Sequence, residues 1–132
     1  MHTKKLLLTL FFFFSLLAGC GLEAKTLSEF YGKEFEDVTK IEILNGSTGY
    51  KKIVTDKKVI NDFLSELKDI QFIPDDNQDE RVGFLYSNTL FQGENITFSF
   101  SPNEIDDHYY YTEPDINPII DSFYENLKVA EE

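Results

Sequence analysis

The sequence of 132 residues contains no tryptophan and only one cysteine, Cys20. A single cysteine excludes a disulfide within the chain and a zinc site built from several thiolates. Histidine is almost as scarce, because His108 is the only one beyond the first few residues. The motifs of phosphate-binding loops, dinucleotide-binding folds and nucleophile elbows do not occur in the sequence. We therefore expect no enzymatic activity and no cofactor.

Positive charge is also in short supply, since 24 acidic residues stand against 12 lysines and arginines. The formal net charge of −12 argues against nucleic acid as a partner and against electrostatic adhesion to anionic lipid. It favours a well-solvated surface and, where the protein binds a partner, a cationic one. Apolar residues are not lacking, because 13 phenylalanines and 7 tyrosines supply material for a core.

The one long hydrophobic run lies at the start of the chain. Lys4 and Lys5 precede an apolar segment at 6–17, which ends at small residues. This segment is shorter than the roughly 20 residues that a membrane-spanning helix needs. A basic start, a short apolar segment and small residues at a cleavage site are the three parts of a secretory signal.

The end of this run carries a more specific motif, Leu17-Ala18-Gly19-Cys20. It matches all four positions of the lipobox, so residues 1–19 resemble a bacterial lipoprotein signal peptide. The resemblance implies that Cys20 receives a diacylglyceryl group, becomes the first residue of the mature chain, and is often N-acylated as well. Two or more acyl chains hold a protein stably on a membrane. The implied location is the extracytoplasmic side of the cell membrane, with the membrane lipid attached at Cys20.

Two other interpretations of this segment stay open, a plain secretory signal and an uncleaved anchor. Cleavage before Cys20 would remove Lys4 and Lys5 but none of the 24 acidic residues, and would change the formal net charge from −12 to −14. We expect residues 20–39 to form the lipidated N-terminus and a tether, with a short helix or turn after Thr26. Residues 40–130 have the length of a single domain.

Two helical stripes and several strands can be identified within 40–130. Asp56 is positioned to cap a helix, and Pro118 suits the first turn of another. The apolar stripes are Val59, Ile60, Phe63, Leu64 and Leu67, and then Ile116, Ile119, Ile120, Phe123, Tyr124 and Leu127. Strands are predicted at 41–44, 50–55, 70–73, 82–91, 95–100 and 108–112, with Ile96, Phe98 and Phe100 on one face. The order ββαβ-βββα predicts an α+β fold, a mostly antiparallel sheet with two helices on one face.

Tyr109, Tyr110 and Tyr111 form the main candidate for partner binding. In a strand, Tyr109 and Tyr111 share one face and Tyr110 points to the other, so one side is expected to be partly exposed. Aromatic residues are enriched at interfaces. Packing of these side chains within the sheet is the alternative.

Acidic residues suggest two further candidate sites. Asp75, Asn77 and Asp79 follow the opening of a calcium-binding loop, but Glu80 and Tyr86 occupy the positions where such a loop has glycine and glutamate. This gives a weak candidate for a metal site in the 75–80 loop.

The other candidate is a carboxylate-based hydrolase that uses Asp106 and Asp107 beside His108. Such chemistry needs two acids at a set separation across a cleft. A chain with this many acids offers such pairs by chance, so we consider a hydrolase the weakest of these interpretations.

The domain also resembles small uncharacterised lipoproteins of Gram-positive bacteria. The residues that carry this resemblance are Thr55-Asp56 and Ile60 at a helix opening, the Tyr-rich strand at 109–111, and Ile119-Ile120 in a final helix. The resemblance brings no assigned activity. We expect a non-enzymatic binding or accessory module for a protein or cationic peptide partner. The version with a cationic peptide resembles the immunity lipoproteins of peptide producers.

Overall fold

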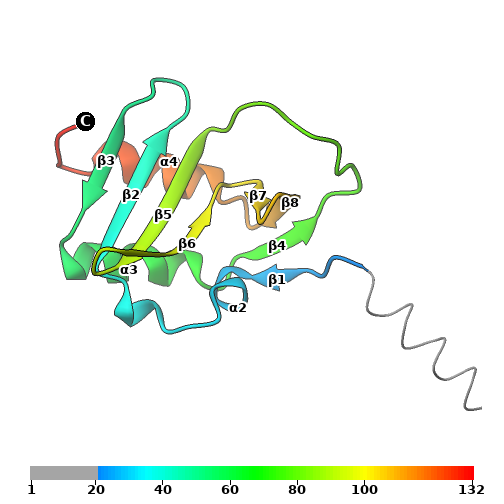
Figure 1. Cartoon of the computed structure of the whole chain (residues 1–132), viewed down its shortest axis with the longest axis horizontal. Coiled ribbons are helices and arrows are strands. Elements are labelled where there is room, and N and C mark those ends of the chain that lie inside the picture. The colour runs from blue at the N-terminus through cyan, green and yellow to red at the C-terminus, as the bar shows by residue number, and fades with distance from the viewer. Residues whose placement is uncertain (1–20) are drawn as a thin grey trace, which may run out of the picture.

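A hairpin begins the larger of two sheets. In a computed structural model, which describes residues 21–132, strands β2 (Lys40–Asn45) and β3 (Lys51–Val54) pair in antiparallel fashion. A turn that contains Gly46 and Gly49 joins them, and the side chain of Asn45 accepts a hydrogen bond from the Ser47 N–H at 2.9 Å. Strands β5 (Tyr86–Gln92) and β6 (Asn95–Phe100) complete a four-stranded sheet of order β3-β2-β5-β6 (Figure 1). The predicted leader and Cys20 lie outside the described residues.

A second antiparallel sheet contains β1 (Lys25–Thr26), β4 (Gln71–Pro74), β8 (His108–Glu113) and β7 (Glu104–Ile105), in that order. The fold is therefore α+β, but it has two antiparallel sheets where the sequence suggested one. Strand β4 pairs with β8, which lies far along the chain, with Ile73 opposite Tyr111. Pro74 has no N–H for a longer ladder, and residues 75–85 then lead away to β5.

The segment before β2 packs into the core. Helix α2 (Leu27–Tyr31) starts at a capping box, in which the Thr26 hydroxyl accepts from the Glu29 N–H and the Glu29 carboxylate accepts from the Thr26 N–H. A 3₁₀ turn η1 (Phe35–Asp37) follows. Leu27, Tyr31 and Val38 are buried. The hydrophobic core thus includes residues that precede position 40, where the sequence suggested that the domain begins.

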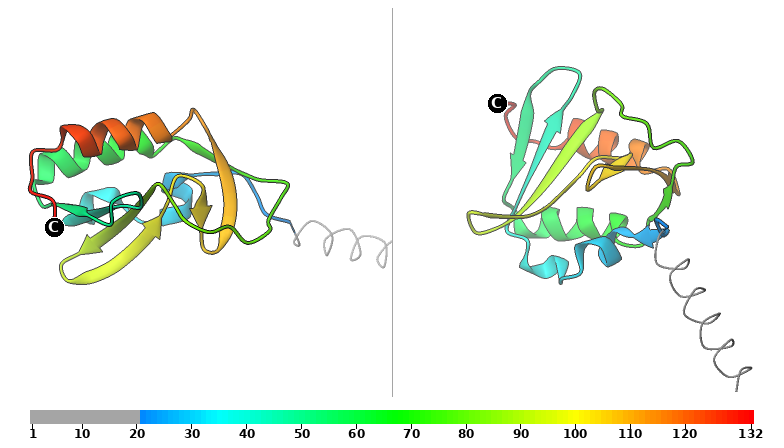
Figure 2. Two further views of the ribbon diagram at one scale, coloured as in Figure 1. Left: turned by 90° about the horizontal axis from the view of Figure 1, so that it is seen from above. Right: turned by 45° about the vertical axis from the view of Figure 1, so that its right-hand side comes forward.

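The two long helices form where the apolar stripes predicted them. Helix α3 (Lys57–Leu67) is capped by Asp56, whose carboxylate accepts from two backbone N–H groups of the first turn. Helix α4 (Asn117–Asn126) has Pro118 in its first turn. Figure 2 shows α3 and α4 side by side. No helix within residues 21–132 combines the length and the apolar character needed to cross a membrane.

Lys52 connects the first sheet to the end of α4. It lies in a row of inward-facing residues that continues through Ile43 and Asn88 to Phe100. Its ammonium group donates to the carbonyl oxygens of Tyr124 at 2.7 Å and Leu127 at 3.1 Å. Carbonyls at the end of a helix have no partner within the helix. Lys52 therefore adds a second donor to the Tyr124 carbonyl, which also accepts from the Leu127 N–H at 3.3 Å, and supplies a donor to the Leu127 carbonyl.

Two local predictions are wrong. Ile96 was expected to share an inward face with Phe98 and Phe100, but 66% of Ile96 is exposed. The register between β5 and β6 shifts at Leu90/Phe91, and such an irregularity breaks the alternation of faces. No strand was predicted between residues 100 and 108, but this segment contains the short strand β7.

Candidate functional site

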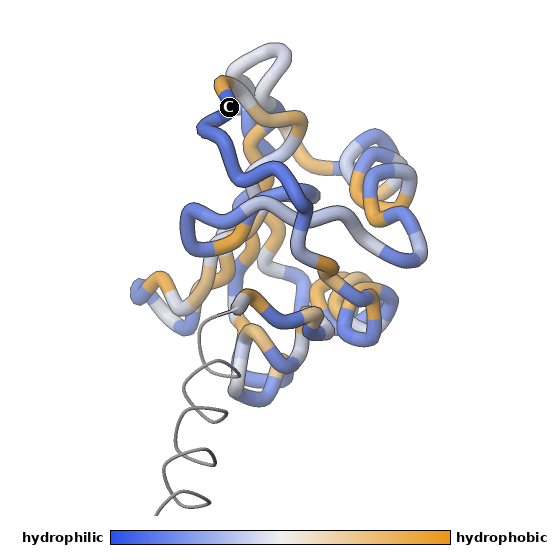
Figure 3. The backbone as a smooth tube through the Cα atoms, turned by 90° about the vertical axis from the view of Figure 1, so that its right-hand side faces the viewer, coloured by the Kyte–Doolittle hydropathy of each residue, from blue (hydrophilic) through white to orange (hydrophobic). Residues whose placement is uncertain are grey.

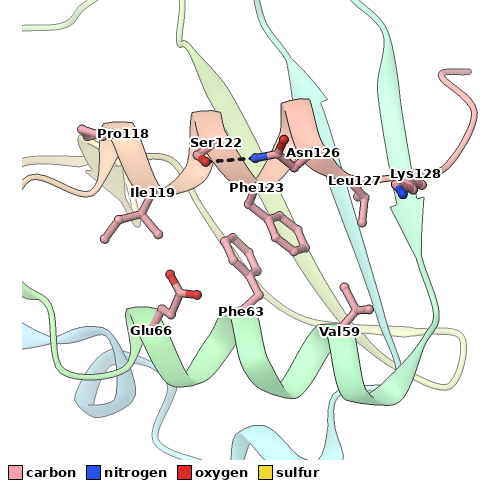
Figure 4. A pocket seen from close by; sticks show the side chains of 10 residues that line it. All are labelled: Val59, Phe63, Glu66, Pro118, Ile119, Ser122, Phe123, Asn126, Leu127 and Lys128. Atoms are coloured by element: carbon pink, nitrogen blue, oxygen red, sulfur yellow. Dashed lines mark hydrogen bonds between the residues drawn. The ribbon is translucent and has the colours of Figure 1, made fainter.

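A groove of about 710 Å³ runs between α3 and α4 (Figure 4). Figure 4 shows the two helices antiparallel, so that the end of α4 lies over the start of α3. The lining residues are Val59, Phe63, Glu66, Pro118, Ile119, Ser122, Phe123, Asn126, Leu127 and Lys128. Every one of them lies on α3, on α4 or directly after α4.

Two stacked aromatic rings form the floor of this groove. The rings of Phe63 and Phe123 are nearly parallel, with centroids 3.8 Å apart. Val59, Ile119 and Leu127 flank them, and these three side chains are only partly buried against the core. Figure 3 shows the two helices nearly end-on, with hydrophobic residues toward the strands and toward the neighbouring helix. The helix pair thus has more apolar surface than the strands cover.

The edges of the groove are polar but carry few charges. The Asn126 side chain donates to the Ser122 hydroxyl at 3.2 Å on the α4 side. Glu66 lies on the α3 side near Pro118, and Lys128 lies at the opposite end (Figure 4). An apolar floor with a few polar groups on its edge is the usual character of a binding groove.

A second hollow of about 450 Å³ adjoins the groove at Pro118, which lines both. Its other lining residues are Asn45, Ser47, Leu85, Tyr86, Asp115, Asn117 and Asp121. The Tyr86 hydroxyl donates to Asp121 at 2.6 Å. Burial of Tyr86, together with this carboxylate, raises the pKa of its hydroxyl above the ordinary value. Hydrogen bonds from Asn117 lower the pKa of Asp115, so this carboxylate is charged at neutral pH.

The tyrosines of β8 do not form the exposed aromatic surface that was predicted as a candidate. Tyr109 and Tyr110 are both buried, and only Tyr111, at 50% exposure, is open to solvent. Residues 75–81 cover the outer side of the strand. The Arg81 guanidinium lies 4.5 Å from the centre of the Tyr109 ring, and the Arg81 N–H donates to the Tyr109 hydroxyl at 2.9 Å.

The candidate calcium loop uses its oxygens internally. The Asp75 carboxylate accepts from the Asn77 N–H at 3.1 Å and from Arg81 at 3.0 Å. The Asn77 side-chain oxygen accepts from the Asp79 N–H at 2.9 Å. The hydrogen bond from Arg81 lowers the pKa of Asp75. Within residues 21–132, no group of three or more histidine, cysteine, aspartate or glutamate side chains could hold a metal ion.

Asp106 and Asp107 form the two-residue turn between β7 and β8. Both have positive φ, 51° and 64°, as a type I′ hairpin turn requires. Aspartate tolerates this region better than most residues. The turn therefore accounts for the neighbouring acids that suggested a hydrolase, and His108 at the start of β8 is exposed.

Comparisons of the chain with protein-family models, with curated proteins and with solved structures find no match.

The sequence did not predict the groove, although the two apolar stripes contain its apolar lining residues apart from Pro118. The polar lining residues Glu66, Ser122, Asn126 and Lys128 lie outside both stripes. Ile116, Ile120 and Tyr124 face the core, and Ile119 and Phe123 are partly buried beside them. This spacing is the ordinary pattern of a core-facing helix, so the stripe itself did not indicate a groove.

Proposed function

We propose that this chain is a lipoprotein, held on the extracytoplasmic face of the cell membrane by acyl chains on Cys20. We further propose that it is a non-enzymatic binding or accessory module for a protein or peptide partner. In this proposal α3 and α4 pack on one face of the strands and present the groove between them. The lipobox at residues 17–20 supports the anchor, and the groove supports the binding role.

The observation that carries the binding role is the apolar groove itself. Val59, Ile119 and Leu127 remain partly open to water beside the stacked pair of Phe63 and Phe123. Covering such a surface releases free energy, at roughly 25 cal/mol for each Å² of apolar area removed from water. A groove between two helices suits a partner segment that presents an apolar face.

The polar groups of the groove support binding more than catalysis. They comprise one hydroxyl–amide pair, Ser122 with Asn126, and two charges at opposite ends, Glu66 and Lys128. A nucleophile needs a base within hydrogen-bond reach and a group that orients that base. Ser122 has only an amide beside it.

The anchor is tested by expressing the full chain and its Cys20→Ser variant in a Gram-positive host. We expect the unchanged chain in the membrane fraction, with a mass that includes acyl chains and lacks residues 1–19. The Cys20→Ser variant should lose both properties. Membrane attachment and an identical mature mass for the two chains would refute the anchor.

The binding role is tested in the same cells with a photo-crosslinking amino acid. We would place it at Ser122, on the edge of the groove, and as a matched control at Glu125, on the same helix but outside the groove. We expect a defined crosslinked product from position 122 alone. The same products from both positions, or none from position 122, would contradict a partner in the groove.

A further inference from the structure

We infer that the segment held in this groove is a cationic amphipathic helix, whose apolar face covers the groove while its basic side chains reach the acidic hollow beyond Pro118. This inference rests on the proposed binding function and specifies the chemistry of the partner. It requires that apolar and acidic surfaces adjoin, that their arrangement fits a helix, and that other occupants fit less well.

The two surfaces meet at one residue. Pro118 lines the apolar groove on one side and the acidic hollow on the other. Asp121 is two residues from both Ile119 and Phe123, so it projects from the opposite flank of α4, where Tyr86 contacts it. A partner that covers Ile119 and Phe123 therefore reaches this hollow with long side chains that cross over Pro118. In the hollow, Leu85 offers apolar contact for the methylene stem of a lysine or arginine, as such side chains prefer.

The carboxylates of the hollow keep oxygens available. The hydrogen bonds of Asp115 involve Oδ1, which accepts from the backbone and side chain of Asn117. Asp121 accepts from Tyr86 at its Oδ1. The second oxygen of each carboxylate has no hydrogen bond among the described residues, and a basic side chain suits both positions.

The length of the groove fits a short helix. Helix α4 has 10 residues, and a helix of that length extends about 15 Å. An amphipathic helix laid along it presents side chains at i, i+3, i+4 and i+7 to the groove. Glu66 and the hollow make the Pro118 end acidic, and Lys128 makes the other end basic. The basic end of the bound helix is therefore expected at Pro118.

Charge argues against two other occupants of the groove. A second copy of this chain would bring a formal net charge of −12 against an equal charge, and an anionic lipid surface is repelled in the same way. A cationic helix is attracted by the same field. The overall charge and the local hollow thus favour the same partner.

The probe for the test is a model helix of about 14 residues with leucines on one face, lysines on the other and one tryptophan on the leucine face. The protein contains no tryptophan, so the emission reports on the peptide alone. Two control peptides replace lysine by glutamate or scramble the order so that no apolar face remains. The protein is used as the cells process it, in phosphatidylcholine nanodiscs, with empty nanodiscs as the blank.

We expect saturable binding of the leucine–lysine helix with a blue shift of tryptophan emission. Both control peptides should bind at least about tenfold more weakly. The pair Asp115→Asn and Asp121→Asn keeps the hydrogen bonds to Asn117 and Tyr86, and should weaken binding by about tenfold at low salt. That loss should shrink at about 0.5 M salt, where screening is strong. The matched control Glu94→Gln, at an exposed position in the turn between β5 and β6 and outside the lining of both the groove and the hollow, should change affinity by less than about twofold.

A second variant tests the groove without touching the core. Ser122→Arg places a bulky cation at an exposed position on the edge and should abolish binding without lowering the melting temperature. Equal binding of the lysine and glutamate helices, an equal effect of Glu94→Gln, or dimers that close the groove would overturn the inference. If no model helix binds while position 122 still crosslinks a partner in cells, the binding function stands and the cationic helix is refuted.

Discussion

Replacing Lys52 by methionine tests how the sheet and α4 are held together. Lys52 is 8% exposed, and its ammonium group lies 4.6 Å from the centre of the Tyr124 ring. Methionine retains most of the side-chain volume but cannot donate to the carbonyls of Tyr124 and Leu127. The substitution therefore removes the donors and leaves the packing largely intact.

The expected loss of stability follows from opposing contributions. An acceptor left without a partner costs about 1–3 kcal/mol, and this applies to the Leu127 carbonyl. The Tyr124 carbonyl loses one hydrogen bond but keeps the one from the Leu127 N–H. The charge at the C-terminal end of a helix contributes about 0.3–1 kcal/mol more. Methionine offsets part of this loss because it no longer buries an ammonium group. The net expectation for Lys52→Met is a loss of about 2–3 kcal/mol, or about 10 °C in melting temperature.

The assay is urea unfolding followed by circular dichroism, together with thermal melts. Lys51→Met is the matched control, because Lys51 is the neighbouring lysine and its nearest acid, Glu42, is 4.0 Å away. Its loss should stay below about 0.5 kcal/mol, as for exposed ion pairs. A Lys52→Met variant within about 0.5 kcal/mol of the unchanged protein would show that Lys52 does not stabilise α4. Equal losses for the two variants would show that the burial of Lys52 is irrelevant.

Two further substitutions probe the surroundings of the acidic hollow. A Cβ atom at Gly46 would lie 1.9 Å from the carbonyl oxygen of Phe84, so Gly46→Ala must displace the 82–85 loop. We expect this variant to lose about 1–3 kcal/mol of stability and to be cleaved faster by proteases in that loop. The control Gly21→Ala places its Cβ in open space and should change neither property. Above pH 10 the Tyr86 hydroxyl ionises in the unfolded state, but its raised pKa keeps it protonated in the folded state. The contribution of Tyr86 to the free energy of unfolding should therefore fall by about 1.4 kcal/mol for each pH unit above 10. Tyr86→Phe should be about 1–2 kcal/mol less stable at neutral pH and show a shallower alkaline decline in urea titrations, and an unchanged decline would exclude Tyr86 as its source.

The parts of the fold that sequence predicted correctly depend on local patterns. The α3 stripe and its Asp56 cap lie within one segment, and the β2–β3 hairpin is defined by adjacent strands and a glycine-containing turn. The division into two sheets depends on the pairing of β4 with β8, which brings Ile73 opposite Tyr111. No short-range pattern specifies that pairing, so the sequence alone suggested a single sheet.

The exposure of the candidate site residues also depends on contacts between distant segments, which local patterns do not predict. Strand alternation predicted that Tyr109 and Tyr111 share a face, but it contains no information about what covers that face. Gln78 and Arg81 reach across from a distant loop, with the Gln78 side chain accepting from the Tyr109 N–H at 2.9 Å, and they bury Tyr109. In α4 the stripe correctly places Ile119 on the apolar side of the helix, where it packs against the core, but the stripe does not show that Ile119 also lines an open groove.

The proposed anchor and the fold together determine how the domain would lie relative to the membrane. With Cys20 lipidated, as proposed, residues 21–24 are the whole link between the membrane and β1, and four extended residues span at most about 14 Å. Strand β1 pairs antiparallel with β4, with Lys25 opposite Phe72, so the link leaves the sheet beside Pro74, where the acidic 75–80 loop begins. Anionic lipid repels that loop, which opposes adhesion of the domain at the end where it is tethered. In this proposal the short link holds the domain near the bilayer, and the charge of the 75–80 loop favours an orientation that leaves the groove between α3 and α4 open to a partner.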